Sequence, residues 1–98
     1  MLMKILYIKE RLTMNCLALL ESGNYVINLC RALERNGFVF EVVSTPCQIS
    51  KGGCGYSLKF PCEYKNIVLD FARKLNYKVL EIYSTNDMIT KFTYEKIY

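Results

Sequence analysis

Five cysteines carry most of the reactive chemistry open to this chain of 98 residues, and two of them lie in one glycine-rich stretch. The stretch is STPCQISKGGCGYSLKF, residues 44–60, and it contains Cys47 and Cys54. A thiolate is a strong nucleophile, and electropositive, accessible surroundings favour its formation. Glycine allows successive backbone N–H groups to converge on one anion. Cys54 would have electropositive surroundings of this kind, because Lys51 supplies a positive charge and Gly52, Gly53 and Gly55 supply backbone amides.

Several classes of site are excluded by residue type. The chain has no histidine, so Cys-His nucleophile pairs, Ser-His-Asp triads and imidazole metal sites cannot form. The cysteine count is odd and no two cysteines have a CxxC spacing, so neither an even disulfide framework nor a thioredoxin-type site is expected. We therefore expect no bound cofactor and no resident metal.

The other three cysteines have simpler interpretations. Cys16 and Cys30 fall on apolar faces and are expected to be buried, unreactive thiols. Cys62 follows Pro61 at a predicted helix start, which favours a role near the helix cap over a catalytic one. Cys47 shares the loop with Cys54 and could either resolve an oxidised Cys54 or only fill space.

Composition indicates one globular domain, because 52% of the residues are hydrophobic and 22% are charged. The net charge of +4 is scattered along the chain, which is a weak basis for nucleic-acid binding. The N-terminal stretch has charges at Lys4, Lys9, Glu10 and Arg11, and no segment reaches the length of a membrane span. We expect a cytoplasmic protein that binds neither nucleic acid nor membrane.

Hydrophobic periodicity predicts an α+β fold with the element order β-α-β-β-α-β. The expected strands and helices are 15–21, 24–36, 38–45, 55–60, 62–75 and 78–84. This order most often folds as a ferredoxin-like split βαβ sandwich, with both helices on one face of a four-stranded antiparallel sheet in the order 4-1-3-2. Residues 14–85 would form this domain, with an N-terminal extension over 1–13 and a C-terminal tail over 86–98. Either flank could add a strand at the sheet edge, and Met14 is an alternative start.

This topology places the loop of Cys54 near the start of the first helix. The end of the first strand, the start of that helix and the loop between the second and third strands all meet at one sheet edge. The helix start is formed by Ser22, Gly23 and Asn24, and its unpaired N–H groups attract anions. A thiolate at Cys54 would be stabilised there, so its pKa should fall below the ordinary value of about 8.5.

The loop resembles the Se/S carrier protein-like domain family, small Cys-Gly loop proteins of anaerobic bacteria. The matching residues are Thr45-Pro46, Gln48 to Ser50, Cys54-Gly55 and Ser57 to Phe60, within a resemblance that extends from Asn15 to about Tyr83. The family's arginine after Thr-Pro is replaced by Cys47 in this chain. The segment LLESGNYVINLCRALERNG of this chain, residues 19–37, also resembles the first half of the family's domain, in which a small polar residue follows the first strand.

The resemblance implies a carrier of sulfur or selenium and not a stand-alone enzyme. Cys54 would hold the atom as a persulfide or selenosulfide between a donor protein, such as a cysteine desulfurase, and an acceptor protein. No cofactor is needed, and a homodimer is left open. Sulfur and selenium are not distinguished, because both move by the same displacement chemistry.

Two hypotheses of other classes remain open. The first is a ligand-sensing or oligomerisation module, since this fold serves many regulatory roles. The second is a thiol-only redox or metal site built from Cys47, Cys54 and Cys62, which would lack a fourth ligand unless a dimer supplied it.

Overall fold

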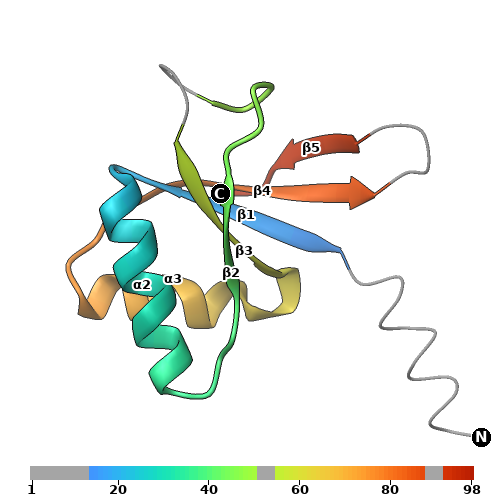
Figure 1. The fold of residues 1–98 in the computed structure, drawn as a ribbon. Coiled ribbons are helices and arrows are strands. Elements are labelled where there is room, and N and C mark those ends of the chain that lie inside the picture. Colours follow the sequence, from blue (N-terminus) through green and yellow to red (C-terminus); the bar gives the residue numbers. More distant parts are fainter. Residues whose placement is uncertain (1–13, 51–54, 88–91) are drawn as a thin grey trace, which may run out of the picture.

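The computed structural model describes residues 14–50, 55–87 and 92–98, and it shows an α+β domain with two helices and one sheet. Figure 1 shows both helices packed beside the twisted sheet. In chain order the elements are β1 (Asn15–Leu20), α2 (Gly23–Arg35), β2 (Glu41–Ser44), β3 (Tyr56–Pro61), the short 3₁₀ helix η1 (Cys62–Tyr64), α3 (Lys65–Lys74), β4 (Val79–Asp87) and β5 (Phe92–Lys96).

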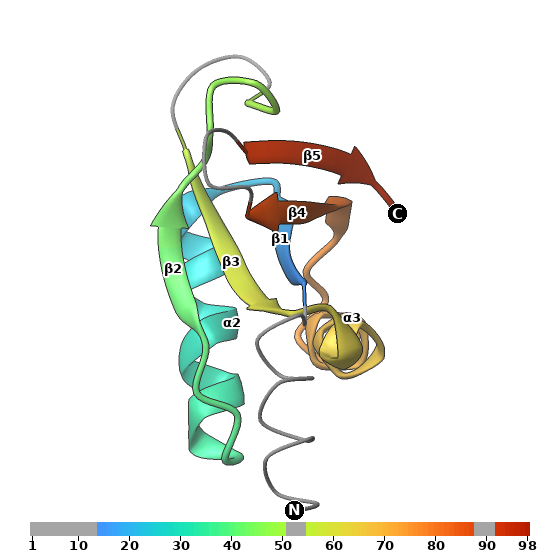
Figure 2. The ribbon, with the colours of Figure 1, turned by 90° about the vertical axis from the view of Figure 1, so that its right-hand side faces the viewer.

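The sheet has five strands in the order β2-β3-β1-β4-β5, and every neighbouring pair is antiparallel. The first four strands follow the predicted order, and a fifth strand is added at the sheet edge, as the sequence leaves open for either flank. The tail supplies the additional strand, because β5 pairs with β4 from Tyr83↔Lys96 to Asp87↔Phe92 (Figure 2). The other proposed edge strand, within residues 1–13, lies outside the described residues.

Helix α2 begins and ends where its capping residues allow. Ser22 is the N-cap, and its Oγ accepts a hydrogen bond from the Tyr25 backbone N–H at 3.3 Å. At the other end Gly37 has a φ of 92°, and the Phe38 N–H donates to the Leu33 carbonyl at 2.9 Å. This is a Schellman ending, and the helix stops at residue types that tolerate a left-handed backbone.

The second helical segment differs from its prediction at both ends. Its first turn, Cys62–Tyr64, is a 3₁₀ helix, and α3 proper ends at Lys74. Asn76 has a φ of 61°, and the Tyr77 N–H donates to the Ala72 carbonyl at 2.8 Å, which closes a second Schellman ending. The helical spacing of Tyr64, Ile67, Val68, Phe71 and Leu75 predicts a shared buried face, but Leu75 is 38% exposed because the helix ends before it.

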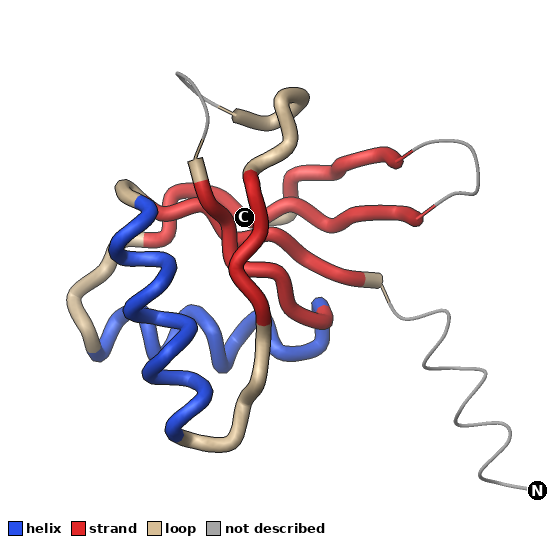
Figure 3. The backbone as a smooth tube through the Cα atoms, in the orientation of Figure 1, coloured by secondary structure: helices blue, strands red, loops and turns tan. Residues whose placement is uncertain are grey.

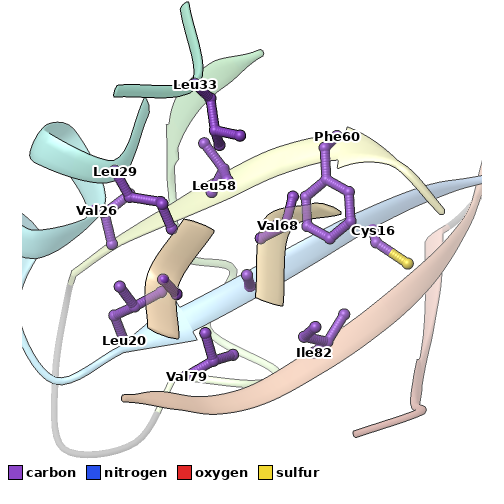
Figure 4. Close-up of a cluster of buried hydrophobic side chains, with 12 residues drawn as sticks. Cys16, Leu20, Val26, Leu29, Leu33, Leu58, Phe60, Val68, Val79 and Ile82 are labelled. Carbon is purple, nitrogen blue, oxygen red and sulfur yellow. The ribbon is translucent and has the colours of Figure 1, made fainter. Parts of the chain in front are cut away.

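Both helices cover the same face of the sheet, as predicted. Alternate residues of β1 point to opposite faces, and Cys16, Ala18 and Leu20 point toward the helices. Figure 4 shows the resulting core. Its other buried members come from both helices and from β3 and β4: Val26, Leu29, Leu33, Leu58, Phe60, Val68, Ala72, Val79 and Ile82.

A disulfide joins Cys16 of β1 to Cys62 at the start of η1, with 5.0 Å between the two Cα atoms. The expectation that Cys16 is a free thiol is therefore wrong, although Cys16 is buried as expected. The pairing follows from strand register, because Asn15 lies opposite Pro61 and the Cys62 N–H donates to the Met14 carbonyl at 3.0 Å. Closing 46 residues of chain restricts the unfolded state and stabilises the fold by about 4 kcal/mol.

In the described part of the chain, neither α2 nor α3 is long and apolar enough to cross a bilayer.

Leu29→Ala should lower the free energy of unfolding by about 2–5 kcal/mol, because Leu29 is 0% exposed in the core between α2 and the sheet. The matched control is Leu75→Ala, which should change stability by about 0.5 kcal/mol or less because that side chain faces solvent. Urea unfolding followed by circular dichroism measures both. Equal losses for the two variants would contradict the assignment of buried faces.

Candidate functional site

The described elements that frame the loop of residues 45–55 meet at one edge of the sheet. Figure 3 shows the start of α2 close to the point where β3 begins, and residues 45–50 extend from the same edge. This is the arrangement that the topology predicted. Four of the predicted site residues, Lys51, Gly52, Gly53 and Cys54, lie outside the described residues, whereas Gly55 and Cys47 are described.

The first turn of α2 touches the first residue of β3. A Cβ atom added to Gly23 would lie 3.0 Å from Cδ2 of Tyr56, so the tyrosine ring rests directly on the glycine backbone. Tyr56 is only two residues beyond Cys54 in the chain. Thus the start of α2, with the exposed Ser22 and Asn24 beside Gly23, lies close to where the chain leaves the loop.

A second tyrosine contact braces the start of α2 against the end of α3. The rings of Tyr25 and Tyr77 are stacked with their centroids 4.5 Å apart. Asn28 Nδ2 also donates a hydrogen bond to the Tyr77 hydroxyl at 3.2 Å. The first turns of α2 are therefore held by contacts with both β3 and the segment that follows α3.

The base of the loop is closed by two hydrogen bonds beyond the paired strands. The Thr45 N–H donates to the Gly55 carbonyl at 2.8 Å. The Thr45 Oγ1 and Ser57 Oγ atoms are 2.6 Å apart, and Ser57 is 0% exposed. These contacts extend the β2–β3 ladder to Gly55, the residue bonded to Cys54.

The first half of the loop folds over the sheet face that the helices leave open. Residues 46–49 form a turn in which the Ile49 N–H donates to the Pro46 carbonyl at 3.1 Å. Ile49 is buried against Leu17 and Leu19 of β1. Cys47 stands at the middle of this turn with an exposed, free thiol.

The described cysteines differ in whether their sulfur atom is free to act as a nucleophile. Cys16 and Cys62 are bonded to each other, so their sulfurs are not free nucleophiles. Cys30 is half-buried, less than predicted, and its thiol donates to the Phe40 carbonyl at 3.4 Å. Burial raises the pKa of the Cys30 thiol above its ordinary value, and the nearby Glu34 carboxylate raises it further. Cys30 is thus poorly suited to nucleophilic attack at neutral pH.

The three-thiol metal site built from Cys47, Cys54 and Cys62 finds no support among these residues. The Cys62 sulfur is bonded to Cys16, which removes one of the three ligands. Within residues 14–50, 55–87 and 92–98, no three acidic or cysteine side chains gather in a metal-binding arrangement.

Three residues that shape the site were missed at the level of sequence: Thr45, Ile49 and Tyr56. Ile49 is the one large apolar side chain in an otherwise polar loop, which signals that it packs against something. The contact of Tyr56 with Gly23 has no local signal, because the two residues meet only through the order of the strands.

No curated protein and no solved structure matches the chain. A family model described as "Putative Se/S carrier protein-like" matches residues 15–84, which run from the first residue of β1 into β4 and include the whole loop. This chain therefore belongs to the Se/S carrier protein-like family.

Proposed function

We propose that this protein carries sulfur or selenium on Cys54 between a donor protein and an acceptor protein. The observation that carries the proposal is the family match over residues 15–84, which includes the Cys54-Gly55 pair. The proposed donor is a persulfide-forming enzyme such as a cysteine desulfurase. The protein acts as a carrier that other enzymes load and unload, and it needs no cofactor of its own.

The chemical step is a displacement at sulfur. The Cys54 thiolate attacks the outer sulfur of the donor persulfide, the donor sulfur–sulfur bond breaks, and the donor cysteine leaves as a thiolate. The product is a persulfide on Cys54, with the proton retained on the outer sulfur at the moment of transfer. A nucleophile on the acceptor then takes the outer sulfur and expels Cys54 as a thiolate. Selenium would move by the same two displacements.

The described surroundings of the loop support this chemistry in two ways. The contact between Gly23 and Tyr56 brings the start of α2 to the edge from which the loop projects, and a helix start favours negative charge. The Thr45 N–H donates to the Gly55 carbonyl, and the hydroxyl groups of Thr45 and Ser57 share a hydrogen bond. These contacts fix the base of the loop on the sheet.

Loading with sulfur tests the proposal directly. The protein is incubated with a cysteine desulfurase and cysteine, and persulfide is measured by mass spectrometry of the trapped thiols. Cys54→Ser should abolish loading because the variant lacks the thiol that takes the sulfur from the donor persulfide. Cys47→Ser is the matched control, since Cys47 lies in the same loop and its thiol is exposed; it should slow loading at most. Persulfide formed on Cys47 in the absence of Cys54 would contradict the assignment of Cys54 as the residue that is loaded. Binding of a small ligand that Cys54→Ser leaves unaffected would favour a sensing module instead.

The pH dependence of alkylation should separate the thiols. We expect the Cys54 iodoacetamide rate to rise with a midpoint below the ordinary cysteine pKa of about 8.5, because a thiolate close to a helix start would be stabilised. Cys30 should react slowly at this pH, because its raised pKa keeps the thiol protonated until the solution is more alkaline. Peptide mapping at each pH gives the rates. A Cys54 midpoint of 8.5 or above would remove the electrostatic part of the proposal.

A further inference from the structure

The Cys16–Cys62 disulfide has no part in the proposed carrier site. Cys62 follows the last residue of β3, whereas the loop precedes the first residue of that strand. A strand of six residues is about 20 Å long, so the disulfide and the loop lie at opposite ends of β3. Cys16 and Cys62 therefore form a separate sulfur centre.

The two sulfurs of this centre are unequally accessible. Cys16 is 0% exposed and belongs to the helix-facing core, among side chains that include Phe60 and Val68 (Figure 4). Cys62 is only partly buried, at the first position of η1. A thiolate from solvent must approach the sulfur it attacks, which excludes the fully buried Cys16 and leaves the partly buried Cys62 as the point of attack.

The segment that the disulfide attaches, η1 with α3, is otherwise held mainly by apolar packing. Val68 and Ala72 are its fully buried side chains, and the ring of Phe38 meets Tyr64 and Phe71 edge-on. The ion pairs of Asp70 with Arg73 and Lys74 are internal to α3. The ladders of β1 with β3 and β4 do not depend on this segment, so it can loosen while the sheet stays paired.

We propose that Cys16 and Cys62 form a redox-active pair that a dithiol reductant opens at the Cys62 sulfur. Reduction removes the covalent link between β1 and the start of η1, so that the hydrogen bond from the Cys62 N–H to the Met14 carbonyl and the apolar packing of α3 hold the segment there. One reductant thiolate attacks Cys62, the bond between the cysteines breaks, and Cys16 leaves as a thiolate that takes a proton. The second reductant thiol then attacks the mixed disulfide, which frees the Cys62 thiolate. The dithiol becomes a cyclic disulfide, and the protein gains two electrons and two protons.

The burial of Cys16 makes the reduction depend on movement of η1 and α3. A thiolate expelled into the apolar core is poorly solvated, and a poor leaving group slows exchange. Loosening of η1 and α3 lets water reach the departing sulfur. Reduction should therefore accelerate when α3 packs less tightly.

The test uses the full chain with Cys47→Ser and Cys54→Ser, so that both loop thiols are absent and carrier function is irrelevant to the result. The oxidised protein is treated under native conditions with mercaptoethanol to trap the mixed disulfide, and with dithiothreitol to complete reduction. Peptide mass mapping locates the adduct, circular dichroism reports whether the sheet remains folded, and hydrogen exchange follows α3.

We expect the mercaptoethanol adduct on Cys62, complete reduction with the sheet retained, and faster amide exchange in α3 than in β1 and β3. Val68→Ala should speed reduction by about tenfold because it loosens the buried face of α3. Val39→Ala is the matched control and should leave the rate unchanged, since Val39 is 74% exposed. An adduct on Cys16, or reduction only at denaturant concentrations that unfold the sheet, would overturn the proposal. Loss of carrier activity in other experiments would not affect this result.

Discussion

Burial of β1 on both of its faces is the constraint on which the rest of the structure depends. Cys16, Ala18 and Leu20 face the helices, while Leu17 and Leu19 face the other way and are nearly as well covered. A strand that is apolar on both faces must be central and must have cover on both sides. The helices provide the first cover, and the loop after β2 provides part of the second through Ile49.

The candidate site follows from this second cover. A loop that only joined two strands could extend freely into solvent, but here Ile49 and the turn at Pro46 hold its first half against the open face. Its last described residue, Gly55, is held by Thr45. The ends of the segment that carries Cys54 are therefore anchored to the sheet, while its sequence remains rich in glycine. Anchored ends restrict where a carried atom can be presented, which suits transfer between two protein partners.

Local signals in the sequence were enough to predict both helices apart from the ends of the second, and the order of the elements was enough to predict the order of the first four strands. Asn36-Gly37 ends α2 because these residues tolerate the left-handed backbone, and Val26, Leu29 and Leu33 repeat with helical spacing. The disulfide could not be predicted, because it needs the register of β1 against β3 and the two cysteines are 46 residues apart. The contact of Tyr56 with Gly23 likewise exists only after the sheet has formed. Cys54 itself lies outside the described residues, so its assignment rests on the sequence and the family match.

The disulfide also makes the middle of the chain a covalent ring. The ring runs from Cys16 to Cys62 and contains α2, β2, the loop and β3. Trypsin cleaves after lysine, and a single cut after Lys51 would open the ring. The two pieces would stay joined by the disulfide, because Cys16 lies on one piece and Cys62 on the other. The piece that begins at Gly52 has Cys54 as its third residue, within easy reach of chemical peptide synthesis and ligation. Selenocysteine or an isotope-labelled cysteine could therefore be built into position 54, the proposed carrier residue, of an otherwise natural chain.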